Sequence, residues 1–207
     1  MRTITKNIYS FDELNKKAQE KAIENYRCGM DFPFENDNIN SIEAIADGCK
    51  WTAHWDSYDG VSYNVWFTLN EYNADAILML TGKRAMAYIY NHYINPNTKA
   101  KTYWLNHCIY ADGRKNWKRK SRITYTLDDC PFTGYCMDDA FADAWNEWKR
   151  NFNNDFSTVE GFIRAVGNKL GSYWTTDNEW LMSDECIAET LEVNGYEFTE
   201  DGSHYYG

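Results

Sequence analysis

The sequence predicts an α+β fold, with an antiparallel sheet in the N-terminal two-thirds, helices packed on it and a helical C-terminal part. Alternation of apolar and polar residues, the period of a strand, is concentrated in 1–127, whereas helical periodicity dominates 128–207. Such segregation of strands and helices is typical of α+β folds. The dipeptide Asp59-Gly60 between two alternating segments is a strong local signal for an antiparallel hairpin. A chain of 207 residues suits one domain, so we expect a single domain over 1–207.

The first predicted elements are a short strand and a helix. Residues 2–9 alternate weakly and predict the strand. Ser10 begins a Ser-x-x-Glu capping box, and Asn15 is an alternative N-cap. The helix then runs to about Cys28, because apolar residues recur on one face every four residues, and Gly29 is expected to end it.

A loop, a short helix and the hairpin follow. Residues 31–40 are polar and contain a proline, which predicts a loop. Ser41 is expected to cap a short helix that stops at Gly48. The hairpin strands are predicted at 49–58 and 61–71. The residues expected on one face of this hairpin are Trp51, Ala53, Trp55, Val61, Tyr63, Val65 and Phe67.

The middle of the chain predicts a helical stretch and a second pair of strands. Residues 74–94 are helical with a break at Thr81-Gly82. Alternating Tyr, Trp, Ile and Thr residues predict strands at 99–110 and 121–127, with a charged loop at 111–120 between them.

The last part of the chain predicts three helices. The first spans 139–152, the second follows an N-cap at Ser157, and the third begins at Ser183 and ends at Asn194-Gly195. A short strand is expected after it, and 199–207 are expected to form a polar tail.

The charge is unevenly distributed along the chain. The formal net charge is −10; residues 1–127 contain 17 Lys and Arg against 14 Asp and Glu, and residues 128–207 contain 4 against 17. An acidic part is repelled by nucleic-acid phosphates and anionic lipid, which argues against that part binding either one. It favours either a face that meets a basic partner protein or a solvated surface that aids solubility. The nine Trp and sixteen Tyr suit both a core and a contact surface.

The sequence predicts a cytoplasmic protein without a membrane partner. The first residues lack the apolar stretch of a secretory signal, and no apolar run approaches transmembrane length. The six cysteines are therefore expected to be reduced thiols.

Three segments at the start, middle and end of the chain resemble a known family. They are Tyr9-Ser10-Phe11-Asp12-Glu13-Leu14 with the helix Ala18-Gln19-Glu20-Lys21-Ala22, then Asp129-Cys130-Pro131-Phe132-Thr133-Gly134-Tyr135-Cys136, and Asn194-Gly195-Tyr196-Glu197-Phe198-Thr199-Glu200-Asp201-Gly202. Together they resemble small proteins from phages and prophages of Gram-positive bacteria, usually labelled hypothetical or antitoxins of toxin–antitoxin stability systems. The middle, 72–127, departs from this family in being richer in Tyr, Trp and basic residues.

The resemblance implies a phage accessory protein that acts in a host bacterial cell. Many such proteins block bacterial immunity. Anti-CRISPR proteins are one such class; they are commonly small, acidic and non-catalytic, and bind the cationic nucleic-acid channels of their targets.

Two cysteines in the middle segment are candidate zinc ligands. Cys130 and Cys136, together with His107 and Cys108, supply the four thiolate and imidazole donors of a structural zinc site. The five-residue spacing between the first two is not the usual short zinc spacing, so a tight turn that packs both thiols inward is the alternative. We expect no other cofactor.

A basic segment over Arg114–Arg122 surrounds Trp117. Cations beside an aromatic ring suit stacking on a base and contact with phosphates. The segment predicts either a solvated loop, or contact with the guide RNA or an acidic face of a ribonucleoprotein, or capture of a nucleotide signal.

The C-terminal carboxylates are the main candidate site. Glu185, Glu189 and Glu192 fall on one helical face, and Asp177 and Glu179 precede them. Such a row suits a basic groove, or it is an ordinary exposed helix face.

The residues predict binding rather than catalysis. The four histidines are scattered, and His54 and Asp56, which share a strand face, are too few for a triad. We expect no enzyme but an anti-CRISPR-like inhibitor that binds a host nucleic-acid-handling effector through its acidic C-terminal residues and Trp117. The alternatives are an antitoxin that neutralises a partner toxin and a nucleotide-signal sponge.

Overall fold

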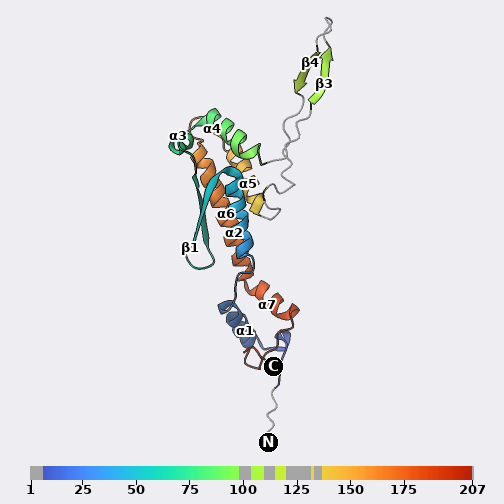
Figure 1. Cartoon of the computed structure of the whole chain (residues 1–207). Coiled ribbons are helices and arrows are strands. Elements are labelled where there is room, and N and C mark those ends of the chain that lie inside the picture. Colours follow the sequence, from blue (N-terminus) through green and yellow to red (C-terminus); the bar gives the residue numbers. More distant parts are fainter. Residues whose placement is uncertain (1–6, 98–103, 110–114, 120–131, 133–136, 207) are drawn as a thin grey trace. The chain divides into compact units, whose positions relative to one another are not determined.

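A computed structural model describes residues 7–97, 104–109, 115–119, 132 and 137–206, with only the backbone of the two short strands at 104–109 and 115–119 (Figure 1). The chain divides into two compact units, which we call the terminal unit (Met1–Glu35 and Trp174–Gly207) and the central unit (Asn36–Tyr173). The expectation of one domain over 1–207 stays a prediction.

The order of the elements confirms the predicted α+β class with a helical C-terminal part. The central unit contains α2 (Glu35–Cys49), β1 (Trp51–Ser57), β2 (Tyr63–Leu69), α3 (Ala74–Leu78), α4 (Gly82–Ile89), a π-helical turn η2 (Tyr90–Ile94), β3 (Trp104–Ile109), β4 (Lys115–Arg119), α5 (Met137–Arg150) and α6 (Val159–Leu181), whose last residues belong to the terminal unit. The terminal unit contains a 3-10 turn η1 (Phe11–Glu13), α1 (Lys16–Cys28) and α7 (Asp184–Val193).

The predicted hairpin is confirmed, and β2 has the predicted alternation of buried and exposed side chains. Strands β1 and β2 pair antiparallel, with Trp51 opposite Leu69 and Trp55 opposite Val65. The turn is fixed by the Asp59 carboxylate, which accepts hydrogen bonds from the backbone N–H groups of Val61 and Ser62 and whose pKa these bonds lower. The hairpin therefore presents one apolar face to the rest of the central unit.

Phe162 on α6 is the centre of the core of the central unit. Its side chain is fully buried. Aromatic rings from three other elements contact it: Trp51, Tyr93, Phe141, Trp145 and Trp148, with ring centroids 5.9–6.4 Å away. These contacts join α5, α6, the π-helical turn and the hairpin through one residue.

Two glycines let α6 lie directly on strand β2. A Cβ added at Gly167 would be 2.4 Å from the carbonyl oxygen of Val65, and one at Gly171 would be 2.6 Å from that of Tyr63. Glycine within a helix costs about 1 kcal/mol relative to alanine. That cost has a packing reason here, because no larger residue fits between helix and strand.

Helix α2 is longer than the sequence analysis predicted. It begins at Glu35, so much of the polar stretch 31–40 is helical and Ser41 is not its N-cap. The buried Ser41 hydroxyl instead donates to the carbonyl of Asp37 one turn earlier, at 2.8 Å. The buried Asn38 extends the stripe of Ile42 and Ile45 by another turn, which explains why the helix starts early.

Helix α6 differs from the prediction at its N-terminus. Its N-terminus is capped by Thr158, whose hydroxyl accepts from the N–H of Gly161 at 2.9 Å, and not by Ser157. It continues beyond Leu170 because Trp174 and Asn178 are buried at four-residue spacing.

The basic segment was wrongly predicted as a loop through 111–120. Lys115–Arg119 form strand β4, which pairs antiparallel with β3. Lys and Arg residues are compatible with a strand at a sheet edge, where charged side chains can reach solvent. The second strand predicted at 121–127 lies outside the described residues, as do most of 2–9.

The terminal unit packs α1 against α7. The cap at Asn15, whose side chain accepts from the N–H of Ala18 at 3.1 Å, starts α1. The buried residues between the helices are Phe11, Leu14, Ala18, Ala22, Ile187, Leu191 and Phe198. Residues 199–206 are not a free tail, because Phe198 forms backbone bridges to both Tyr9 and His204.

We expect Gly167→Ala to lower the free energy of unfolding by about 1–3 kcal/mol, because the added methyl group must displace the backbone of β2. Urea unfolding followed by circular dichroism measures the effect. The matched control is Gly161→Ala in the same helix, where the added Cβ meets only the Thr158 hydroxyl, at 3.2 Å. If both variants change stability equally, the close approach does not constrain the fold.

Candidate functional site

The negative charge of the protein is concentrated in the terminal unit. This unit holds 6 Lys and Arg against 15 Asp and Glu, a net charge of −9. The central unit holds 15 against 16, a net charge of −1. The segment 174–207 contains nine of these carboxylates and neither Lys nor Arg. The unit therefore attracts cations over its own surface.

Helix α7 positions the most regular row of carboxylates. Ser183 caps it by accepting from the N–H of Cys186 at 3.3 Å, and the acidic first turn suits the positive end of the helix dipole. Ile187 and Leu191 bury one face of the helix against α1. The opposite face is consequently exposed along the whole helix.

Glu185, Glu189 and Glu192 occupy that exposed face as predicted, and we call them the acidic row. No ion pair found in the described part of the chain involves any of the three. Neighbours at this spacing lie about 5–6 Å apart at Cβ and repel each other when ionised. The acidic row is therefore an exposed surface of like charges without an ion pair to any described residue.

Two other carboxylates of this unit are neutralised by α1. Asp184 pairs with Arg27, which also pairs with Glu24, and Asp201 pairs with Lys21 at 2.6 Å. The Lys21 ammonium, followed by the hydroxyls of Thr199 and Ser203, lowers the pKa of Asp201. These pairs tie the C-terminal segment to α1 and do not involve the acidic row.

The end of α6 adds two exposed carboxylates and an exposed tryptophan. Asp177 and Glu179 are exposed, and partial burial raises the pKa of Asp177. Trp180 beside them is 58% exposed. Sequence reasoning missed Trp180, although a tryptophan within an acidic stretch is a signal for a contact residue.

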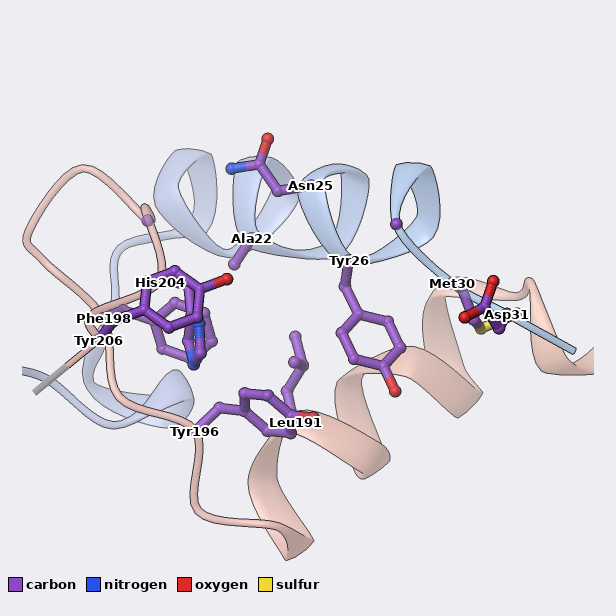
Figure 2. Close-up of a pocket in the computed structure, with 12 residues that line it drawn as sticks. Ala22, Asn25, Tyr26, Met30, Asp31, Leu191, Tyr196, Phe198, His204 and Tyr206 are labelled. Atoms are coloured by element: carbon purple, nitrogen blue, oxygen red, sulfur yellow. The ribbon is translucent and has the colours of Figure 1, made fainter. Parts of the chain in front are cut away.

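A cavity of about 720 Å³ opens between α1, α7 and the C-terminal segment (Figure 2). Tyr26 points from α1 toward Tyr196, and the two rings meet edge to face with centroids 5.8 Å apart. Burial, and then the neighbouring Tyr196, raise the pKa of Tyr26, so its phenol stays neutral well into the alkaline range. Such a cavity has the size of a small-ligand pocket.

The C-terminal segment supplies the rest of the aromatic wall. His204 lies 5.1 Å from the ring of Tyr196 and 4.3 Å from that of Tyr206, centroid to centroid, at steep angles. Phe198 closes the same end, and Asp31 lies at the other end of the cavity in Figure 2. This pocket was not predicted, because its walls come from residues about 170 positions apart in the sequence.

The predicted zinc ligands are not tested by the structure. Cys130 and Cys136 lie outside the described residues, and His107 and Cys108 lie on β3, where only the backbone is described. Within the described side chains, no group of three or more His, Cys, Asp or Glu residues is placed to hold a metal ion. The zinc site stays a prediction.

Exposed aromatic residues of the central unit are candidate anchors, and only some of their side chains are described. Trp117 lies on β4, where side chains are not described, so its role and that of Arg114–Arg122 stay predictions. On the hairpin, Tyr58 is 75% exposed and Trp66 is 45% exposed, and the ring of Trp66 stacks on His54. These anchors belong to the central unit, whereas the acidic row belongs to the terminal unit.

No helix in the ranges covered by the structure is both long enough and apolar enough to cross a membrane.

We expect Asp201→Asn to weaken the terminal unit at neutral pH and to flatten its acid dependence. A carboxyl with a lowered pKa contributes stability above its ordinary value near 4 and loses it as the pH falls below that value. Urea midpoints measured from pH 7 to pH 3 should fall less steeply in the variant. The control is the adjacent Glu200→Gln, because no ion pair of Glu200 is found in the described part of the chain; equal slopes would contradict the assignment.

Comparisons with known proteins identify no relative from which a function could be inferred. No family model matches the chain, and neither a curated protein nor a solved structure shows significant similarity to it.

Proposed function

We propose that the protein is a non-catalytic inhibitor that docks its acidic terminal unit on the cationic surface of a nucleic-acid-handling effector of host defence, such as a CRISPR nuclease. The observation that carries this proposal is the net charge of −9 on one unit, with the acidic row exposed and without ion pairs among the described residues.

The charge favours a protein partner over a nucleic acid. Phosphates repel a surface of this sign, so a direct complex of this unit with DNA or RNA is disfavoured. The channels that hold nucleic acid in such effectors are lined by Lys and Arg. A row of carboxylates one helical turn apart competes for the same cations that would bind phosphates.

Exposed aromatic rings suit the same role. Trp180 adjoins the acidic residues of α6, and tryptophan is prominent among residues that dominate binding energy. The acidic row would steer association, and the ring would bury apolar surface once contact forms. The resemblance to phage and prophage proteins supports a target in the bacterial host.

The direct test is cleavage of target DNA by a panel of purified CRISPR effector nucleases from Gram-positive bacteria, with and without the protein. We expect stoichiometric inhibition of at least one nuclease, weakened by salt because exposed charges are screened. If none is bound or inhibited, and the protein instead rescues growth from a co-expressed toxin, the antitoxin alternative replaces this proposal.

We expect Glu185→Lys with Glu189→Lys to weaken binding to the inhibited nuclease by at least tenfold, because two attractions become repulsions, with the main effect on the association rate. Surface plasmon resonance at two salt concentrations measures both rates.

The matched control is Glu43→Lys with Asp47→Lys, an exposed pair at the same spacing on α2 in the central unit. It changes the net charge by the same amount. Equal weakening by both double variants would show that total charge, and not the acidic row, governs binding.

A further inference from the structure

The pocket of the terminal unit combines aromatic walls with a negative surrounding. Tyr26, Tyr196, Phe198, His204 and Tyr206 supply rings at steep angles to one another. The face of a benzene-type ring carries negative electrostatic potential, and several faces around one space attract an organic cation. The geometry thus suits a positively charged group with a flat or apolar body.

The charges around the pocket favour the same kind of ligand. Among the described residues that line it, Asp31 is the only acidic one, and none is Lys or Arg. Lys21 and Arg27, on the helix α1 that forms one wall of the pocket, pair with Asp201, Asp184 and Glu24. The terminal unit as a whole carries −9, so a cation that enters the pocket gains attraction from the entire unit.

We infer that this pocket receives an arginine side chain of the protein partner. Guanidinium is planar, stacks on aromatic faces and is more weakly hydrated than the ammonium of lysine, so it loses less on leaving water. Asp31 lines the opposite end of the pocket from His204 and Tyr206 and adds a negative charge to its wall. This inference rests on the proposed docking to a cationic protein and specifies the residue that anchors it.

The pocket and the acidic row then have separate roles. The exposed carboxylates of α7 attract any cation, lysine included, and act over distance. The ring walls act only at contact and distinguish arginine from lysine. Removing a ring should therefore reduce the preference for arginine over lysine. Removing carboxylates of the acidic row should weaken the binding of arginine and of lysine alike.

The test uses the full chain and fluorescently labelled hexaarginine, hexalysine and hexacitrulline peptides, with binding followed by anisotropy. We expect hexaarginine to bind more tightly than hexalysine, and uncharged hexacitrulline to bind least. Tyr196→Leu and Tyr206→Leu should each weaken hexaarginine binding about three- to tenfold, and affect hexalysine less.

Tyr206 is 84% exposed, so its substitution leaves the core intact and keeps the test valid if Tyr196→Leu unfolds the unit. The matched control is Tyr72→Leu, at a fully exposed tyrosine of the central unit, which should leave binding unchanged. Glu185→Lys with Glu189→Lys should weaken both basic peptides by similar factors.

Several results would overturn the inference. They are equal binding of hexaarginine and hexalysine, unchanged hexaarginine binding in both ring variants, or stronger competition by choline than by arginine amide. The two proposals fail separately. Peptide binding that depends on the rings without inhibition of any nuclease removes the proposed function alone. Inhibition of a nuclease without ring-dependent binding removes the arginine pocket alone.

Discussion

The central unit depends on the contact between helix α6 and strand β2. Gly167 and Gly171 bring the helix backbone against the carbonyls of the strand, at separations that admit no side chain. That approach places Phe162 of the same helix among the rings of the hairpin and α5. Because interiors are close-packed, moving the helix outward by the width of a methyl group would open a gap around this residue. The packing of the aromatic core therefore depends on the close approach at Gly167 and Gly171.

In the terminal unit, ion pairs determine which charged side chains can contact a partner. Its two helices bury a small apolar core, and α1 supplies the cations that neutralise Asp184 and Asp201. Exposed pairs of this kind add little stability, typically below about 1 kcal/mol each. Their larger effect is to engage Lys21 and Arg27 with Asp201, Asp184 and Glu24, so these two cations do not neutralise the acidic row.

Local signals in the sequence were sufficient wherever neighbours in the chain decide the structure. The hairpin at Asp59-Gly60 and the cap at Ser183 were predicted because turn and cap chemistry is local. Ser41 was misjudged because its hydroxyl bonds within a longer helix whose buried face decides its start. The acidic row follows from helical periodicity alone. The pocket does not, because Tyr26 and Tyr196 meet only through the tertiary fold.

The terminal unit is assembled from the first and last stretches of the chain, with the whole central unit inserted between them. Ribosomes add about 5–20 residues per second, so the roughly 165 residues between Ala22 and its partner Ile187 take on the order of 8–30 seconds to synthesise. During that interval the apolar stripe of α1 has no native cover. The inserted residues, whose contacts are continuous in sequence, are free to fold first. Vectorial synthesis thus delays the acidic surface until translation has passed α7, so an incomplete chain cannot present it in folded form.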